Sequence, residues 1–281
     1  MTAIPQPRAA QATVFPILLA VSACHMLNDV MQSMLSSIYP ILKADFALQY
    51  WQIGLLTLAF QGTASLLQPA IGIYTDAKPQ PWSLPLASCC TFLGVMGLAF
   101  APSYPALIAA AMLVGLGSAI FHPESSRVAR VASGGRFGLA QSVFQVGGNF
   151  GTSIGPLLAA FVVLPFGRPS VAIFAALAVL SGIVLVQVSR WYAGHLAARA
   201  KRAVDKTLPL SKGRTIAAIS VLVILTFSKN AYMASLHSYY TFYLIESFGV
   251  DTRTAQLMLF LFLGSVAAGT VLGGPVADRF W

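Results

Sequence analysis

Residues Ser170–Val188 read SVAIFAALAVLSGIVLVQV, an apolar stretch that contains no charged side chain. A helix of about 20 such residues is long enough to cross the hydrocarbon core of a lipid bilayer. Comparable stretches recur along the whole 281-residue sequence, in which only 9% of the residues are charged. Soluble domains contain about 25% charged residues, so the composition argues against a soluble fold and predicts an all-α polytopic membrane protein.

Eight apolar stretches are predicted to be transmembrane helices. Helices are required because lipid offers no hydrogen-bond partners to the backbone groups of a lone strand. The approximate spans are Phe15–Tyr39, Trp51–Ile73, Trp82–Phe100, Tyr104–Phe121, Leu139–Leu164, Ser170–Val188, Ile216–Ile245 and Thr254–Val276.

The Lys and Arg residues are distributed unevenly over the loops between these spans. Thirteen of the 17 fall on one side, three (Lys43, Arg168 and Arg253) fall on the other, and Lys229 lies within a span. Cytoplasmic loops are enriched in Lys and Arg, so we expect a multi-pass protein of the cell inner membrane with a cytoplasmic N-terminus. The net charge of +9 then reflects topology, and we expect the lipid bilayer, and no nucleic acid, as a partner.

The longest connection separates six spans from the two that follow. Residues 190–214 are basic and polar, and they are predicted to form a cytoplasmic linker. The predicted units are a six-helix N-terminal bundle at 1–189, the linker at 190–214, and two helices of an incomplete C-terminal bundle at 215–281. For the linker, a solvated loop attracted to lipid headgroups is favoured over a binding role.

The two parts of the chain are related by an internal repeat. A gap-free shift of the sequence by 202 positions pairs several identical residues, including both charged loop ends. These pairs are Asn28 with Asn230, Phe46 with Phe248, Gly62 with Gly264, Gly72 with Gly274, and Asp76 with Asp278. Parallel repeats of this kind are typical of transporters in which two bundles dock on each other.

Short motifs in the sequence resemble those of a known transporter superfamily. The element G-x-x-x-D at Gly72–Asp76 and Gly274–Asp278, and G-T-S-I-G-P at Gly151–Pro156, are similar to motifs of the major facilitator superfamily. Three more specific stretches resemble the fosmidomycin-resistance family of drug exporters, namely HMLND at His25–Asp29, FHPESSRVA at Phe121–Ala129, and FQVGGN at Phe144–Asn149.

The sequence also departs from the superfamily pattern. Asp76 is followed by Ala77, Lys78 and Pro79, where the pattern has a basic residue and then further Gly and Arg. Any charge relay at this loop is therefore expected to be weaker or to use Lys78. The resemblance also implies four further spans after Trp281, so we expect a C-terminally truncated chain.

The first span carries a polar stripe on one helical face. Ser22, His25, Asp29, Gln32, Ser33 and Ser36 follow one another at offsets of one, three or four residues. An ionisable group in mid-span costs about 2.5–3.5 kcal/mol on insertion scales, so Asp29 is a functional candidate. We predict that Asp29 binds the coupling proton and that His25 tunes it. The alternative is a buried carboxylate neutralised by protonation or hydrogen bonding.

Further polar residues within the spans are candidates for a substrate cavity at the repeat interface. A mid-span cation at Lys229 suits an anionic substrate or an ion pair with Asp29, and the two alternatives remain open. For any single amide, hydrogen bonding between helices is the stronger alternative. The predicted substrate-binding residues are Asn28, Gln32, Gln61, Gln145, Asn149, Lys229, Asn230 and His237.

Charged residues near the predicted inner ends of the helices are candidates for a gate. The resemblance implies that Glu124, Arg127 and Arg130 pair with Asp76 or Lys78 when the inner gate is shut, whereas charges at the lipid interface are an equal alternative. The gating set is Gly72, Asp76, Lys78, Glu124, Arg127, Arg130, Gly274, Asp278 and Arg279. Gly151, Gly155 and Pro156 are assigned to close helix packing and a helix bend.

These observations and the resemblance predict a proton-coupled secondary transporter that exports a small drug, such as fosmidomycin, by alternating access. An inactive or partner-dependent transporter fragment, or a membrane scaffold, is the alternative, in which the missing C-terminal helices or another chain are needed. An enzyme is not expected, because we find no nucleophile, metal cluster or nucleotide-binding loop. No cofactor and no metal site are predicted.

Overall fold

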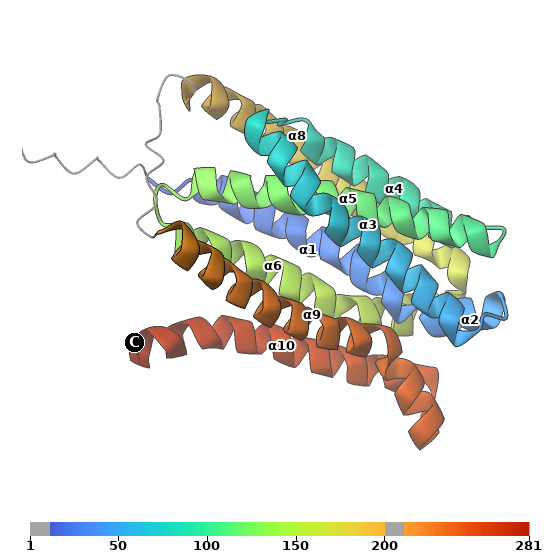
Figure 1. Ribbon diagram of the computed structural model, residues 1–281. Coiled ribbons are helices and arrows are strands. Elements are labelled where there is room, and N and C mark those ends of the chain that lie inside the picture. Colours follow the sequence, from blue (N-terminus) through green and yellow to red (C-terminus); the bar gives the residue numbers. More distant parts are fainter. Residues whose placement is uncertain (1–11, 200–210, 281) are drawn as a thin grey trace, which may run out of the picture.

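The computed structural model describes residues 12–199 and 211–280, and all regular structure within these ranges is helical. The eight long helices are α1 (Phe15–Ser37), α3 (Tyr50–Ala77), α4 (Ser83–Phe100), α5 (Tyr104–Ala132), α6 (Phe137–Leu158), α8 (Ala175–Arg199), α9 (Lys212–Phe248) and α10 (Thr252–Phe280). Short elements connect them, namely α2 (Tyr39–Asp45), a π-helix (Ala159–Val163), α7 (Leu164–Phe166) and a 3-10 helix (Arg168–Phe174). The predicted all-α polytopic fold is confirmed (Figure 1).

Each of the eight predicted spans overlaps one of these long helices, and the fifth and sixth spans also include the π-helix and most of the 3-10 helix, respectively. Five helical segments of the described chain are long and apolar enough to cross a membrane by composition alone. They are Ser83–Phe100, Tyr104–Ala132, Phe137–Phe166, Arg168–Leu196 and Gly213–Phe248. The polar stripe lowers the mean hydropathy of α1, although α1 lies inside the same bundle (Figure 1).

One clear difference from the predicted spans is at the end of α5. The apolar stretch ends at Phe121, whereas the helix continues through Pro123 to Ala132. The continuation stays helical because Val128, Ala129 and Ala132 are buried in the bundle. His122 therefore lies within a helix and not at its end.

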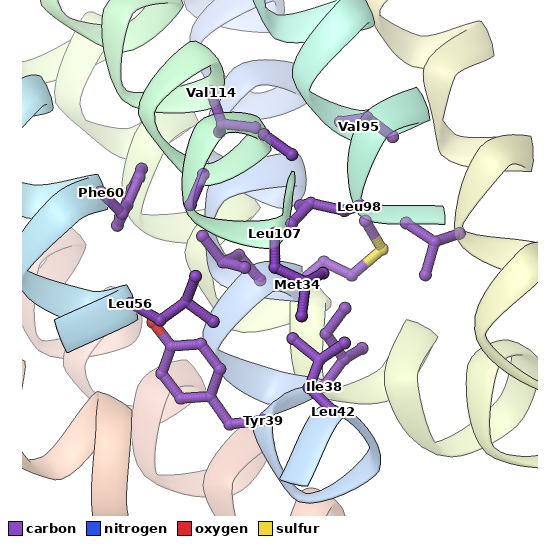
Figure 2. Packing of buried hydrophobic residues seen from close by; sticks show 14 of the residues in the cluster. Met34, Ile38, Tyr39, Leu42, Leu56, Phe60, Val95, Leu98, Leu107 and Val114 are labelled. Carbon is purple, nitrogen blue, oxygen red and sulfur yellow. The ribbon is translucent and has the colours of Figure 1, made fainter. Parts of the chain in front are cut away.

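The first six long helices enclose an apolar core with a polar layer inside it. One cluster of buried side chains joins α1 and α2 to α3, α4 and α5, and Figure 2 labels ten of its members, among them Met34, Leu56, Leu98 and Leu107. A second cluster begins on α1 with Leu18, Val21 and Cys24. The α1 segment between these clusters carries His25, Asn28 and Asp29.

Helices α1 and α6 approach each other closely because α6 has glycines along the contact. A Cβ atom on Gly151 would overlap the backbone of Met26, and one on Gly155 would overlap Ser33. Pro156 then lies inside α6, three residues before the π-helix. Proline removes a backbone donor and π-helical turns often accompany bends, so this region departs from regular α geometry.

Helices α9 and α10 pack against the six-helix bundle at different places. Helix α10 lies along α6, and α9 contacts α1 and α2 (Figure 1). The first half of α9 is exposed, including Ile216, Leu222 and Phe227. Helix α8 continues to Arg199, into the segment assigned to the linker, and residues 200–210 of that linker lie outside the described residues.

Candidate functional site

The carboxylate of Asp29, on α1, is surrounded by four polar side chains. His25 Nε2 lies 3.3 Å from Asp29 Oδ2, and His122 Nε2 lies 3.5 Å from Oδ1. The amide nitrogens of Asn28 and Gln32 donate to Oδ1 over 3.2 and 3.0 Å. Offsets of three and four residues place His25, Asp29 and Gln32 on one helical face, whereas His122 comes from α5.

Both histidines are oriented by their other ring nitrogen. His25 Nδ1 lies 2.8 Å from the carbonyl oxygen of Phe144, and His122 Nδ1 lies 2.9 Å from that of Ser118. A carbonyl oxygen only accepts hydrogen bonds, so we assign the hydrogen of each ring to Nδ1, which donates it. The Ser118 hydroxyl also lies 3.1 Å from His122 Nδ1. In the neutral rings both Nε2 lone pairs then point toward Asp29.

Packing on α6 fixes the position of His25. The rings of His25 and Phe144 are stacked with centroids 4.1 Å apart, and only 2% of His25 is exposed. Gly148 of α6 lies beside His25 and Asp29. A Cβ atom at this position would fall 2.5 Å from His25 Nε2 and 2.9 Å from Asp29 Oδ2. Glycine is therefore required at this position for α6 to approach the pair.

Asp29 also lines a cavity of about 140 Å³ between the two repeats. The cavity is bounded by Asp29, Gln32, Ser33, Ser36, Tyr39, Thr57, Phe60, Gln61, Thr152, His237 and Ser238. Side chains of α1, α3 and α6 thus face side chains of α9 across one space. Three of the residues assigned to substrate binding, Gln32, Gln61 and His237, are among them.

The other residues assigned to substrate binding lie outside this lining. Lys229 and Asn230 are exposed on α9, and among the described residues no ion pair joins Lys229 to Asp29. Gln145 and Asn149 form a weak contact with each other over 3.4 Å on α6. Asn28 is buried beside Asp29.

Contacts between the repeats gather at one end of the cavity, where α1 ends and α3 begins. Tyr50 of α3 donates a hydrogen bond to Glu246 of α9. Thr57 of α3 lies 3.5 Å from Ser238 of α9, and Gln256 of α10 donates to the carbonyl oxygen of Ser37 over 2.5 Å. The repeats are therefore joined at this end, whereas the first half of α9 is exposed at the other.

A charged cluster lies at that other end of the six-helix bundle. Arg127 forms ion pairs with Asp76 over 2.5 Å and with Glu124 over 2.8 Å, and it donates to the carbonyl oxygens of Thr75 and Gly72 over 2.6 and 3.5 Å. Glu124 is fully buried. The cluster thus joins the end of α3 to α5.

Other members of the predicted gating set do not join this cluster. Arg130 packs over the ring of Phe137 at 5.0 Å, and Lys78 is exposed at the end of α3. Gly274, Asp278 and Arg279 lie in the last turns of α10, whose side chains are outside the described part of the chain.

Sequence reasoning missed the part that His122 plays in the site. In the sequence, His122 directly follows the apolar stretch that ends at Phe121, and this position indicates no partner on α1. Its position within α5 brings it to Asp29. The signal in the sequence was His122 itself, a histidine next to an apolar stretch in a protein whose first predicted span contains Asp29.

Comparisons with known proteins agree with this architecture. The sequence pattern described as "Major Facilitator Superfamily" matches residues 21–281. The fosmidomycin resistance protein of Escherichia coli (strain K12) is 53% identical over 287 residues, covering 99% of this chain and 71% of that protein. An uncharacterized MFS-type transporter of Bacillus subtilis (strain 168), YfnC, is 39% identical, covering 95% of this chain and 66% of that protein.

Solved structures show the same fold at lower sequence identity. A bacterial homolog of the human lysosomal transporter Spinster, in an inward-facing conformation, has a TM-score of 0.72 at 17% identity, over 97% of this chain and 64% of that one. A D-xylose–proton symporter has a TM-score of 0.70 at 19% identity, over 95% of this chain and 70% of that one. The chain therefore spans about two thirds of the length of these proteins.

Proposed function

Since this chain belongs to the Major Facilitator Superfamily, we propose that it forms the proton-coupled part of a secondary transporter that exports a small drug by alternating access. The observation that carries the proposal is the position of Asp29, which contacts two histidines and lines the cavity between the repeats. An ionisable group inside a membrane-spanning helix is costly and is typical of proton pathways.

Hydrogen bonding limits where the coupling proton resides. Two amide groups donate to Oδ1 of Asp29, so this oxygen acts as an acceptor. The remaining oxygen, Oδ2, faces the lone pair of His25 Nε2 over 3.3 Å. We assign the coupling proton to this Asp29–His25 contact, with His122 as the second proton acceptor of the group.

Alternating access requires that the cavity open to one side at a time. The contacts of Tyr50 with Glu246 and of Gln256 with Ser37 join the repeats where α1 ends and α3 begins, whereas at the other end the first half of α9 is exposed among the described residues. The positive-inside distribution of Lys and Arg assigns the joined end to the outer side of the inner membrane and the N-terminus to the cytoplasm. In this assignment the structure is an inward-open state.

The proposed substrate class is supported by the similarity to the fosmidomycin resistance protein. We propose a small polar drug such as fosmidomycin, held in the cavity by Gln32, Gln61 and His237. Lys229 and Asn230 lie outside the cavity in this state, so they contact substrate only after α9 moves. The Arg127 cluster is proposed to hold the inner ends of α3 and α5 together.

Transport into inverted membrane vesicles tests the proposal. A proton gradient should drive fosmidomycin uptake by this chain extended with the part of the Escherichia coli relative that the match leaves uncovered. Asp29→Asn should abolish gradient-driven uptake while keeping exchange of labelled for unlabelled drug. Asp251→Asn, at an exposed acid near the start of α10, is the matched control. Full gradient-driven uptake by Asp29→Asn would contradict the assignment.

The chain itself should be measured beside its extended form. Uptake by the extended form alone would show that the further C-terminal part, or another chain in its place, is needed for transport. Uptake by neither form, with both inserted in the membrane, would favour a non-transporting scaffold.

A further inference from the structure

We propose that His25, Asp29 and His122 form a binding site for a divalent transition-metal cation of the Zn²⁺ type, with one coordination position open to the cavity. The inference does not rest on the proposed function, because it concerns binding by three side chains whose geometry is described above. It goes beyond the function, since neither proton coupling nor drug export requires a metal.

The three facing atoms have the chemistry of metal ligands. Both Nδ1 atoms donate to backbone carbonyl oxygens, so each neutral ring directs an Nε2 lone pair inward. These lone pairs meet the carboxylate of Asp29. Three electron-pair donors therefore converge on one point, where a cation is the natural occupant.

The distances between these ligand atoms are close to those of a metal site. The ligand atoms of His25, Asp29 and His122 all lie within 4.8 Å of one another. Zn²⁺ binds nitrogen and oxygen at about 2.0–2.2 Å, which separates the ligand atoms of a tetrahedral site by roughly 3.3–3.6 Å. His25 Nε2 lies 3.3 Å from Oδ2 of Asp29 and His122 Nε2 lies 3.5 Å from Oδ1, so each ring nitrogen is at this distance from one carboxylate oxygen. A rotation of the carboxylate and small shifts of the rings bring the three ligands around one ion.

The surroundings of the ligands also resemble those of a metal centre. Metal-binding histidines usually donate their second ring nitrogen to a carbonyl or carboxylate, which fixes the ring orientation. Both histidines do so here, and Asn28 and Gln32 donate to Asp29 in the same supporting way. The site thus already holds the outer hydrogen bonds that a metal centre requires.

The ligand set also selects the class of cation. Two imidazoles and one carboxylate suit Zn²⁺, Co²⁺, Ni²⁺ or Cu²⁺, whereas Mg²⁺ and Ca²⁺ prefer oxygen ligands alone. Three protein ligands leave a fourth tetrahedral position. Since Asp29 lines the cavity, that position is available to water or to a metal-binding group of a ligand.

Metal binding by the purified, untagged chain in lipid nanodiscs tests the site. After chelator treatment, Co²⁺ titration should give one equivalent of bound metal with the intense visible bands of four-coordinate Co²⁺, and Zn²⁺ should displace it. Asp29→Asn and His122→Gln should each raise the Kd by about tenfold or more, since even outer-shell changes have effects of this size. His195→Gln, at an exposed histidine on α8, should leave the Kd unchanged.

A second measurement keeps the test decisive if a variant fails to fold. X-ray absorption of the Zn²⁺-loaded original chain should show two imidazole ligands and oxygen ligands. Sulfur ligands, which would come from Cys24, Cys89 or Cys90, would overturn the proposal. So would the absence of stoichiometric binding, or unchanged binding in folded Asp29→Asn and His122→Gln. None of these readouts depends on transport.

Discussion

His122 Nε2 lies 3.5 Å from Asp29 Oδ1, so α5 contributes a side chain to the central acid of α1. His25 approaches the other carboxylate oxygen from the preceding turn of α1. A buried acid between two oriented histidines is more constrained than an acid on one helix alone, because movement of either helix changes its surroundings. Protonation of Asp29 or of either histidine can therefore change the packing of α1 against α5.

Gly148→Ala should destabilise the protein and impair the site. The new Cβ atom would lie 2.5 Å from His25 Nε2, so α6 must shift or the ring must rotate. Overpacking of this kind costs about 1–3 kcal/mol. Thermal denaturation in detergent should show a lower Tm. Gly62→Ala is the control, since a Cβ atom there meets nothing within 4 Å, and an equal fall in Tm would contradict the packing argument.

Arg127→Ala should be strongly destabilising because it leaves the fully buried Glu124 without its cation. Removing one partner of a buried ion pair costs about 3–5 kcal/mol. Arg127→Lys should rescue little, since one ammonium cannot replace a guanidinium that bonds Asp76, Glu124 and a backbone carbonyl together.

Two further variants complete the test of Arg127. Adding Glu124→Gln to Arg127→Ala should recover part of the Tm, because the buried charge is then removed. Arg130→Ala should cost no more than about 1 kcal/mol, since the loss within the described part of the chain is the contact with Phe137. A Tm for Arg127→Ala equal to that of Arg130→Ala would be incompatible with the described cluster.

A disulfide between residues 57 and 238 should lock the joined end of the cavity. The side-chain oxygens of Thr57 and Ser238 are 3.5 Å apart across the repeat interface. The double variant Thr57→Cys/Ser238→Cys should therefore cross-link under mild oxidation and stop transport by the extended chain, and reduction should restore it. Each single variant serves as the control. Undiminished transport by the fully cross-linked protein would argue against opening at this end.

The proposed orientation can be checked by labelling with a membrane-impermeant maleimide. In a background with the native cysteines replaced by alanine, Ala44→Cys should react in intact cells, because it is exposed at the end assigned to the outer side. Gln80→Cys, exposed between α3 and α4, should react only after the membrane is opened. The reverse labelling pattern would show that the protein has the opposite orientation in the membrane.

The helical architecture could be predicted from the sequence because each span carries its own signal. Length and hydropathy identify a membrane helix without reference to its neighbours, and each predicted span overlaps a long helix. The α1 stripe could be predicted for the same reason, since helical periodicity alone places His25, Asp29 and Gln32 on one face. Helix ends were harder to predict. Helix α5, for example, extends beyond its apolar stretch because Val128 and Ala129 are buried in the bundle.

Contacts between helices could not be predicted in this way. The pairing of His122 with Asp29 depends on how α5 rotates against α1, and no local pattern encodes that rotation. Lys229 illustrates the same limit, because its mid-span position suggested a cavity residue, whereas the first half of α9 is exposed. Its role in substrate binding stays a prediction.

The central claim is that Asp29 and its histidines exchange a proton for substrate. The most direct measurement is proton release when fosmidomycin is added to the weakly buffered, detergent-solubilised extended chain in the presence of a pH indicator. The account predicts release of protons on drug binding by the original sequence, and none by Asp29→Asn, although the variant still binds the drug. Equal proton release by the two proteins would contradict it.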